Sequence, residues 1–446
     1  MTNDAHQANI INIRRLNAAV LFALVLSAMA DLPGGGYISI FSNQVSLLKY
    51  GITPLLFVFV YFSSQFSRKI TDTFRTAVLV LLMLSFLGGL LAHQISSRQA
   101  HGPASYIIDG AVQTEEAAKM LFQGRNPYKI DYQTTTFGTY SDQLDGTRPH
   151  PGMTHYVYLP GTFLLTAPVQ FISNHLLGWF DVRWIYVTGF AIMLIILSRM
   201  VAPPHRDLVL ILAAFNPFTA RLLLFGVNDF LVLAGVLGAV CLLQRGKMSW
   251  SSVSLGLALT MKQSAWIFLP FYLIAVSAMD RSIHWKKRFQ ALWPGAVTVL
   301  LAIVPFMIWS LPDFFDDVWR FPNGMSVVSY PASGIGLSQW LVTFGVIRDA
   351  YSHYPMWIFT LLIGIPVALL LMRRQWHSNT PANLVWYYAF SSLAIWFTAR
   401  YFNDTHLVYL ILLFTMAPFL SNDQYKKVTD SHASNRPPRK IVRKPL

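Results

Sequence analysis

Asp109 is the residue of this chain best suited to accept a proton during a reaction. It lies in the longest polar interval of a sequence that is otherwise dominated by apolar runs. An aspartate within hydrogen-bond reach of a hydroxyl group can act as a general base. The same carboxylate can instead cap a helix, because it accepts hydrogen bonds from main-chain N–H groups. From the residues alone, these two roles remain equally open.

Three basic residues at the ends of apolar runs could bind an anion: Lys262, Arg400 and Arg221. A cation fixed in a low-dielectric place stabilises a leaving group that gains negative charge. Arginine can bind a phosphate through two parallel hydrogen bonds, whereas lysine acts as a point charge. Alternatively, each side chain extends to the lipid headgroups or pairs with an acid such as Asp229.

Asn228 and Asp229 immediately precede an apolar run and have two possible roles. They could hydrogen-bond a substrate and position Lys262, or they could form the N-cap of the following helix. His406 could donate a hydrogen bond to a bound anion, or it could be an ordinary interfacial histidine.

The sequence contains no strong metal or nucleotide signature. His150 and His155 lie five residues apart without evident companion ligands, and Asp316-Asp317 is not an Asp-x-Asp pair. A phosphate-binding glycine-rich loop is not evident either. We therefore expect no cofactor, although a requirement for a divalent metal stays open.

The composition indicates which elements must position these residues. Of 446 residues, 54% are hydrophobic and 12% are charged, whereas soluble proteins carry about 25% charged residues. Long continuous apolar runs predict membrane-spanning helices rather than barrel strands. We expect an all-α membrane protein, a polytopic helical bundle of about twelve transmembrane helices. The single cysteine, Cys241, excludes a disulfide framework.

The expected spans are 16–31, 45–65, 76–95, 182–199, 208–222, 227–243, 250–264, 265–279, 289–311, 355–372, 382–399 and 406–420. Segments 158–175 and 334–346 are expected to be short surface helices. The expected organisation is N-terminal spans (1–95), an outer loop (96–181), a transmembrane core (182–421) with a second outer loop (312–354), and a basic tail (422–446).

The net charge of +14 is carried mostly by clusters between the spans and by the tail. The clusters are Arg14-Arg15, Arg68-Lys69 with Arg75, Arg199 to Arg206, Arg245 with Lys247, Arg281 to Arg288, and Arg373-Arg374. Positive charge marks cytoplasmic loops, so both termini should be cytoplasmic in a protein of the cell membrane. This pattern favours contact with membrane lipids and argues against a nucleic-acid partner.

Residues 109–124 should form an amphipathic helix on the membrane surface. Its apolar stripe consists of Ala117, Met120, Leu121 and Gly124. Glu115, Glu116 and Lys119 should face water. Gly124 should end the helix, and Pro127 prevents its continuation.

Several motifs of this chain resemble those of the GT-C superfamily of integral-membrane glycosyltransferases. The matching positions are Asp109, Ala117, Met120-Leu121 and Gly124, then 156–163, Phe225-Gly226-Val227-Asn228-Asp229, and Gly256 to Lys262 with Pro270. The ending Gly124-Arg125-Asn126-Pro127-Tyr128 resembles that of the α-mannosyltransferases that use polyprenol-phosphate-mannose. Gly110 departs from the pattern, because it replaces a second acid that often follows the first.

The resemblance implies that Asp109 is the base and that the polyprenyl-phosphate sugar is a substrate rather than a cofactor. A sugar resembling mannose would be transferred, with inversion, to a glycolipid, glycan or protein hydroxyl on the outer face. Tyr128 and Tyr158 could then stack on the sugar, and Glu116 or Glu115 could supply the second acid. Loop 312–332 could contact the acceptor.

Two other readings are compatible with a polytopic membrane protein. A transporter or flippase of lipid-linked sugars should carry charges in mid-membrane and show broken helices or an internal repeat. The charges of this chain cluster at the span ends, which favours the enzyme. A polymerase or ligase of cell-surface glycans would share the lipid-phosphate chemistry but differ in its loop motifs.

Overall fold

The computed structural model describes residues 3–30, 52–65, 67, 70–142, 144, 146–279 and 285–420. They fold mainly into α-helices, as the apolar runs predict. The helices are α1 (Asn3–Ala30), α4 (Thr53–Ser64), α5 (Asp72–Met83), α6 (Gly89–His101), α7 (Asp109–Phe122), α8 (Gly161–Leu177), α9 (Arg183–Met200), α10 (Pro203–Ala214), α11 (Pro217–Phe225), α12 (Asp229–Gln244), α13 (Met248–Met261), α14 (Phe268–Met279), α15 (Trp285–Trp309), α16 (Leu311–Phe315), α17 (Leu337–Thr343), α18 (Trp357–Phe359), α19 (Ile365–His377), α20 (Pro381–Thr398) and α21 (Asp404–Met416).

Shorter segments connect these helices. Three are π-helical: η2 (Leu84–Gly88), η8 (Asp316–Arg320) and η9 (Thr360–Gly364). The 3₁₀ segments are η3 (Pro127–Lys129), η4 (Tyr132–Thr134), η5 (Thr136–Thr139), η6 (Pro151–Thr154), η7 (Gln263–Ile267) and η10 (Ala417–Phe419). Strands β1 (Ser333–Gly334) and β2 (Tyr401–Phe402) pair in parallel.

Among the described residues, four helical segments are long and apolar enough to cross a membrane: Asp72–His101, Arg183–Met200, Lys286–Trp309 and Trp357–His377. The bent pair of α10 and α11 would make a fifth. Each of the twelve expected spans overlaps a helix, but several of these helices are shorter than the ~20 residues that a full span needs. The count of twelve is therefore not confirmed. Residues 31 and 45–51 of the first two expected spans lie outside the described residues.

The expected span 208–222 is broken in the structure. α10 ends at Ala214 and α11 begins at Pro217, with an angle of 54° between the two helices. The break follows from Asn216-Pro217, because the proline ring disfavours helical backbone in the residue before it. The Asn216 side chain then caps α11 by accepting a hydrogen bond from the Phe218 N–H at 3.0 Å.

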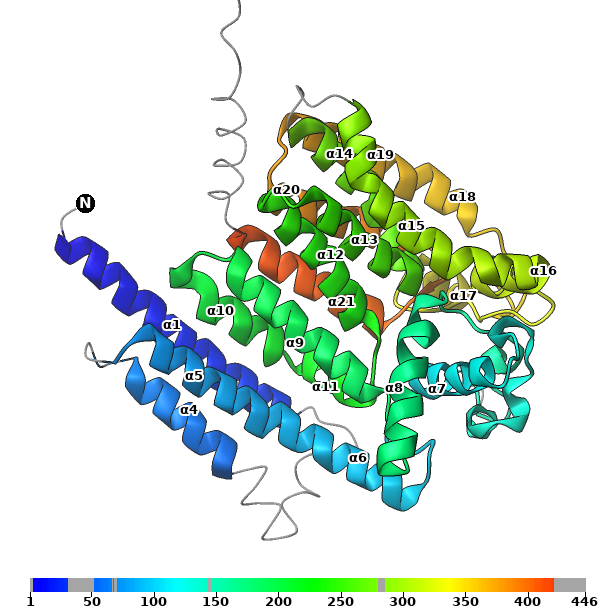
Figure 1. The fold of residues 1–446 in the computed structure, drawn as a ribbon, viewed down its shortest axis with the longest axis horizontal. Helices are drawn as coiled ribbons and strands as arrows, with labels where there is room; N and C mark the ends of the chain where they lie inside the picture. The colour runs from blue at the N-terminus through cyan, green and yellow to red at the C-terminus, as the bar shows by residue number, and fades with distance from the viewer. Residues whose placement is uncertain are drawn as a thin grey trace, which may run out of the picture.

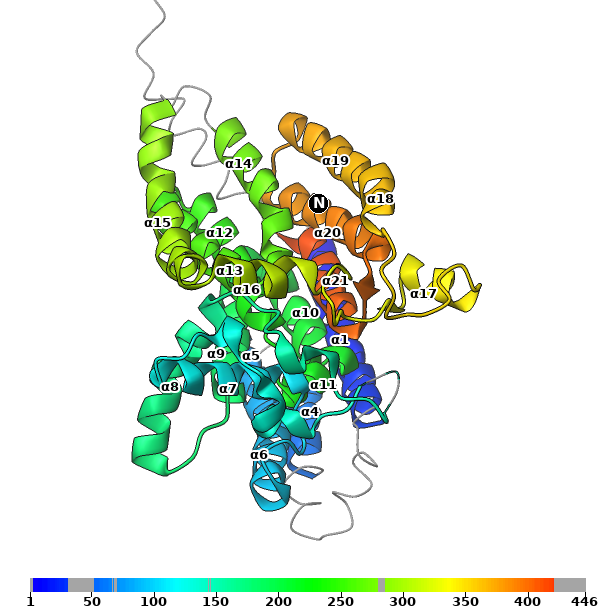
Figure 2. The same ribbon diagram turned by 90° about the vertical axis from the view of Figure 1, so that its right-hand side faces the viewer.

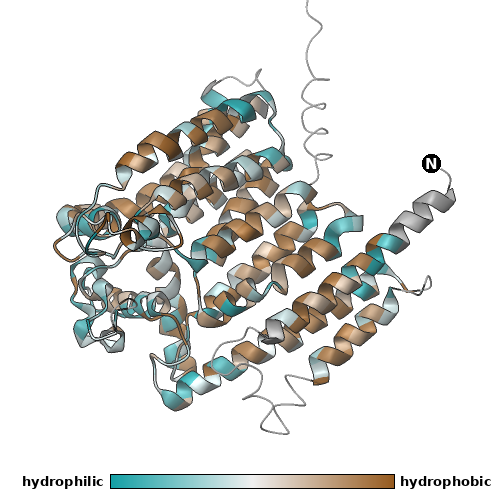
Figure 3. Cartoon of the chain, turned by 180° about the vertical axis from the view of Figure 1, so that it is seen from behind, coloured by the Kyte–Doolittle hydropathy of each residue, from teal (hydrophilic) through white to brown (hydrophobic). Residues whose placement is uncertain are grey.

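The long helices run side by side, and α7, α8, α16 and α17 gather near one end of them (Figures 1 and 2). We call this end the loop end. Apolar residues dominate the helices, and polar residues concentrate in the loops and helix ends (Figure 3). The described basic turns, with Arg199, Arg245 and Arg374, lie at the other end, because α9, α12 and α19 all run away from the loop end (Figure 1). Arg68, Lys69, residues 281–284 and the tail lie outside the described residues.

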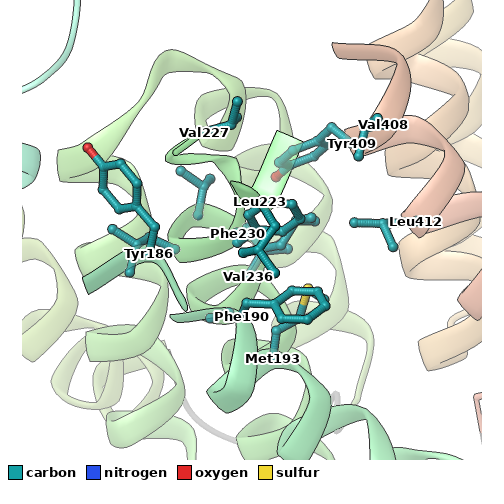
Figure 4. Packing of buried hydrophobic residues seen from close by; sticks show 14 of the residues in the cluster. Tyr186, Phe190, Met193, Leu223, Val227, Phe230, Val236, Val408, Tyr409 and Leu412 are labelled. Carbon is teal, nitrogen blue, oxygen red and sulfur yellow. The ribbon is translucent and has the colours of Figure 1, made fainter. Parts of the chain in front are cut away.

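The core is formed where α9, α11, α12 and α21 meet (Figure 4). Phe190 of α9 packs against Phe230 of α12, with ring centroids 5.1 Å apart. The two helices approach closely because Gly189 has no side chain: a Cβ there would lie 2.4 Å from Leu231. Small residues permit such close helix packing. This core fixes the start of α12, which carries Asn228 and Asp229.

Helix α7 is present and ends as expected, but it is not a surface helix with wet acids. Gly124 adopts a φ of +68°, and the Arg125 N–H bonds back to the Met120 carbonyl, so the helix terminates there. Glu115 and Glu116 are each only 5% exposed. The expectation that both acids face water is wrong, because α8 and the segments η3 and η5 cover the helix. Glu116 pairs with Lys119 at 2.7 Å.

The buried Glu115 is neutralised by residues from the neighbouring helices. Arg98 of α6 lies 2.7 Å from Glu115 and 2.9 Å from Asp181. Asp181 also pairs with Arg183 at 2.7 Å. These two guanidinium groups hold the pKa of Asp181 below its usual value, although burial opposes the shift. We call Arg98, Glu115, Asp181 and Arg183 the buried ion network; it ties α7 to α6 and α9.

Candidate active site

Asp109 is the first residue of α7. The preceding Ile108 is the N-cap residue, and its main-chain N–H bonds to the Phe225 carbonyl at 2.9 Å. The Asp109 carboxylate accepts a hydrogen bond from the Gly110 N–H at 2.6 Å through Oδ1. Its Oδ2 lies 3.0 Å from His150 Nε2. The carboxylate thus contacts a side chain from a distant loop, which a plain helix cap would not require.

His150 is oriented by its own loop. Its Nδ1 accepts a hydrogen bond from the Gly152 N–H at 3.0 Å, so the proton of a neutral ring is on Nε2. Nε2 therefore donates to Asp109. Phe137 packs edge-on against the imidazole, with ring centroids 5.0 Å apart. Sequence reasoning did not connect His150 with Asp109, and their separation of 41 residues gave no local signal.

Tyr158 lies directly against the start of α7. A Cβ at Gly110 would lie 2.2 Å from the Tyr158 hydroxyl oxygen. The hydroxyl therefore occupies the space that a side chain at position 110 would need, which explains why no second acid is accommodated there. Burial raises the pKa of Tyr158, and the charges of Asp109 and Asp229 raise it further. Tyr158 thus packs beside Gly110, the neighbour of Asp109.

Gly110→Ala tests this close approach. The added methyl group overpacks the site, so we expect a loss of about 1–3 kcal/mol in unfolding free energy. Thermal unfolding of the purified protein measures the change. The double variant Gly110→Ala/Tyr158→Phe should recover only part of the loss. It removes the clashing hydroxyl oxygen, but two ring carbons at position 158 would still lie within 3.2 Å of the added Cβ. A single variant as stable as the wild type would contradict the packing.

Lys262 is held at the end of α13, next to the start of α12. Its backbone is extended (φ −154°, ψ 145°), which ends the helix. The ammonium group lies 2.7 Å from Asp229 Oδ2 and 3.5 Å from Asn228 Oδ1. It also lies 5.8 Å from the centroid of the Tyr158 ring. Asn228 occupies the N-cap position of α12, but its side chain makes no capping hydrogen bond. Helix capping therefore does not explain the asparagine at this position.

Residues after α20 and in loop 312–354 form another side of this cluster. β1 and β2 pair, which brings the two loops together. Tyr330 and Tyr401 lie with ring centroids 4.5 Å apart. Burial raises the pKa of Tyr330, and the charges of Tyr401 and Asp109 add to the shift. His406 forms a capping box with Asn403, and its ring centroid lies 5.6 Å from that of Tyr401. We call Asp109, His150, Tyr158, Lys262, Asn228, Asp229, Tyr330, Tyr401 and His406 the polar cluster.

Four expected site residues have other surroundings. Arg400 is 1% exposed and donates to the carbonyls of Tyr330 and Ala350; burial lowers its pKa to about 10. Tyr128 is buried among aromatic rings and donates to the Tyr158 carbonyl at 2.8 Å. Glu116 bonds to Lys119. For Arg221, on α11, no hydrogen bond or ion pair to the polar cluster is seen in the described part of the chain.

A second group of chemistry-bearing residues lies beside Tyr156. His155 Nε2 is 3.0 Å from Asp316 Oδ2, across 161 residues of sequence. Asp317 accepts a hydrogen bond from the Tyr156 N–H at 2.7 Å. Burial raises the pKa of Asp317 and lowers that of His155. The companions of His155, which the sequence did not reveal, are thus supplied by loop 312–354.

This group borders a cavity of about 240 Å³. It is lined by Tyr128, Lys129, Ile130, Asp131, Thr154, His155, Asp313, Asp316 and Asp317.

The model of glycosyltransferase family 87 matches residues 156–415 of the chain. This range contains Tyr158, Asn228, Asp229, Lys262, Tyr330, Tyr401 and His406 of the polar cluster, whereas Asp109 and His150 precede it. Comparisons with curated proteins and with solved structures find no match.

Proposed function

The chain belongs to glycosyltransferase family 87, a membrane family of the GT-C type, and on that premise we propose that it transfers a mannose-like sugar from a polyprenyl-phosphate donor to an acceptor hydroxyl. The acceptor would be a glycolipid, glycan or protein on the outer face of the cell membrane. One observation carries the proposal: the Tyr158 side chain packs against Gly110, next to the Asp109 carboxylate, and its ring centroid lies 5.8 Å from the Lys262 ammonium group.

In the proposed reaction, the acceptor oxygen attacks the anomeric carbon while the bond from that carbon to the phosphate oxygen breaks. The acceptor proton passes to Asp109, and polyprenyl phosphate leaves with the electrons of the broken bond. Attack from the side opposite the phosphate inverts the anomeric configuration. His150 would orient the Asp109 carboxylate through its Nε2–H, and a base held in this way typically contributes about 10²–10⁴-fold to the rate.

Lys262 would bind the donor phosphate and stabilise the further charge that develops on it as it leaves. A fixed cation is effective in a site that excludes water, because the cation is already in place and no side chain or solvent has to reorganise during the reaction. The 2.7 Å contact with Asp229 holds the ammonium group in place. Arg400, buried against two carbonyls, would act by holding loop 312–354 beside the polar cluster rather than by direct phosphate contact.

Transfer of labelled sugar by the purified, reconstituted protein tests the proposal. Polyprenyl-phosphate mannose, glucose and arabinose would be offered with a membrane lipid extract as the acceptor. We expect transfer with at least one donor, and a product whose anomeric configuration is opposite to that of the donor. Retention of configuration would overturn the inverting mechanism. Movement of the donor across the bilayer without any transfer would support the flippase instead.

Lys262→Met is expected to raise the KM for the donor by about 10- to 100-fold, because a charge-assisted hydrogen bond contributes about 1.5–3 kcal/mol. Initial rates at varied donor concentration measure the effect. Lys262→Arg keeps the charge and should retain part of the affinity.

The double variant Lys262→Met/Asp229→Asn separates phosphate binding from a structural role. If Lys262 serves only to neutralise Asp229, removing both charges restores the wild-type KM. Under our proposal the double variant stays impaired.

A further inference from the structure

His155, Asp316 and Asp317 come from two loops that are distant in the sequence. One ligand atom from each residue lies within 4.8 Å of the other two. The His155–Asp316 contact is 3.0 Å. Ligand atoms about 2.0–2.2 Å from a zinc ion in tetrahedral geometry lie about 3.3 Å from one another. The three side chains could therefore close around one ion if the longest separation shortened by at most about 1.5 Å.

Asp317 is a buried carboxyl group that lies beside a second acid, Asp316. It is 2% exposed. It accepts the Tyr156 N–H bond, and among the described residues no basic side chain pairs with it. Burying a charged group is unfavourable unless a counter-charge or a metal ion accompanies it. A cation beside Asp317 would remove this penalty.

The surroundings of the group can accommodate a hydrated ion. The adjacent cavity of about 240 Å³ is large enough for several water molecules, which could fill the remaining coordination positions. The Ser326 hydroxyl donates to Asp316 Oδ1 at 2.8 Å and so holds this carboxylate. Arg320 lies 3.6 Å from the same oxygen but is half exposed, so it neutralises Asp316 only weakly.

We propose that His155, Asp316 and Asp317 bind one divalent transition-metal ion, Zn²⁺ or Mn²⁺. One imidazole nitrogen and two carboxylates make a mixed set of nitrogen and oxygen ligands. Zn²⁺ and Mn²⁺ accept such a set, whereas Ca²⁺ and Mg²⁺ prefer oxygen ligands alone.

The ion would join the loop after α7 to segment η8. Gln113 of α7 donates to the His155 carbonyl at 2.7 Å, so the metal would also steady the helix that carries Asp109. Metal binding itself does not depend on the proposed sugar transfer, and the two can fail separately.

Metal content of the full-length protein tests this proposal. The protein, purified without a histidine tag, is stripped with a chelator, dialysed against Zn²⁺ or Mn²⁺ and analysed by mass spectrometry of the elements. We expect about one ion per chain for the wild type, as in other three-ligand sites, and at least a tenfold loss of affinity in Asp317→Asn. Asparagine still accepts the Tyr156 N–H bond, so the fold should be retained.

Asp313→Asn is the matched control. Asp313 lines the same cavity, but its carboxylate accepts a hydrogen bond from Ser310 and lies outside the metal group. This variant should bind the ion as the wild type does. A chelator should lower the unfolding temperature of the wild type and of Asp313→Asn, but not that of Asp317→Asn. Failure of the wild type to take up either ion overturns the proposal. Equal uptake by the wild type and a His155→Gln/Asp317→Asn variant does the same.

Discussion

Sugar transfer by Asp109→Asn is expected to fall by about 10²–10⁴-fold, because the amide cannot accept the acceptor proton. The change is nearly isosteric. The asparagine Oδ1 can keep one of the two observed contacts, with the Gly110 N–H or with His150 Nε2. Folding should therefore be affected little. The loss should appear in kcat, because the carboxylate acts in the transition state rather than in donor binding.

The measurement is the initial rate of labelled-sugar transfer, with the unfolding temperature recorded for each variant. Asp349→Asn provides the matched control. Asp349 is an exposed acid of loop 312–354, and its Oδ1 accepts the Tyr351 N–H bond, which asparagine can also accept. It should transfer sugar at the wild-type rate.

His150→Gln should lose less activity than Asp109→Asn, because glutamine can still donate a hydrogen bond to the carboxylate. Full activity in a folded Asp109→Asn variant would exclude Asp109 as the base. The remaining acids nearby are already engaged: Glu115 by Arg98, Glu116 by Lys119 and Asp229 by Lys262.

Sequence reasoning identified the helices because their signal is local. A continuous apolar run predicts a helix whatever surrounds it, and every expected span overlaps one. The crossing count was harder to predict, since helices such as α4 and α14 have 12 residues each. The break at Asn216-Pro217 shows the same limit: the proline marks a possible interruption, but packing decides whether the helix bends or stops there.

The residues of the polar cluster that could be found from the sequence are those at the ends of apolar runs. Lys262, Asn228 and Asp229 were selected because a charged or amide group at a span end is unusual, and the structure brings all three into contact. Asn228 and Asp229 lie more than 30 residues from Lys262 along the chain. Nothing in the sequence alone required these two helix ends to meet.

Other predictions failed because they depend on partners far away in the chain. Glu115 was expected to face water, since an acid on an amphipathic helix usually does, but Arg98 from α6 makes its burial possible. The sequence showed no companions for His155, because Asp316 and Asp317, which lie beside it, come from another loop. Pairings of this kind follow from the fold, and a single sequence carries no local signal for them.

Removing Arg98 should destabilise the protein more than any other single change in the buried ion network. Arg98→Met leaves the Glu115 carboxylate buried at 5% exposure without its cation. Breaking a buried ion pair by removing one partner typically costs about 3–5 kcal/mol. Burial already raises the pKa of Glu115, so the carboxyl group should take up a proton in the variant. Asp181 is affected less, because Arg183 remains paired with it.

Unfolding of the wild type and the variant in the same detergent measures this loss. Arg14→Met is the control: it removes a cation whose acid partner, Asp72, is 81% exposed and stays solvated, so the cost should be within about 1 kcal/mol. Arg98→Met/Glu115→Gln should recover part of the stability, because no charge is then left unpaired on Glu115. A single Arg98→Met variant as stable as the Arg14→Met control would contradict this account.

The same comparison links stability to function, because Glu115 and Asp109 are carried by one helix. Arg98 holds α7 against α6 and, through Asp181, against α9. If that attachment positions the base, the folded fraction of Arg98→Met should transfer sugar more slowly than the wild type, and Arg98→Met/Glu115→Gln should regain stability before it regains rate. Equal recovery of both would mean that the network only keeps the chain folded and that other contacts, such as the Ile108–Phe225 hydrogen bond, place Asp109.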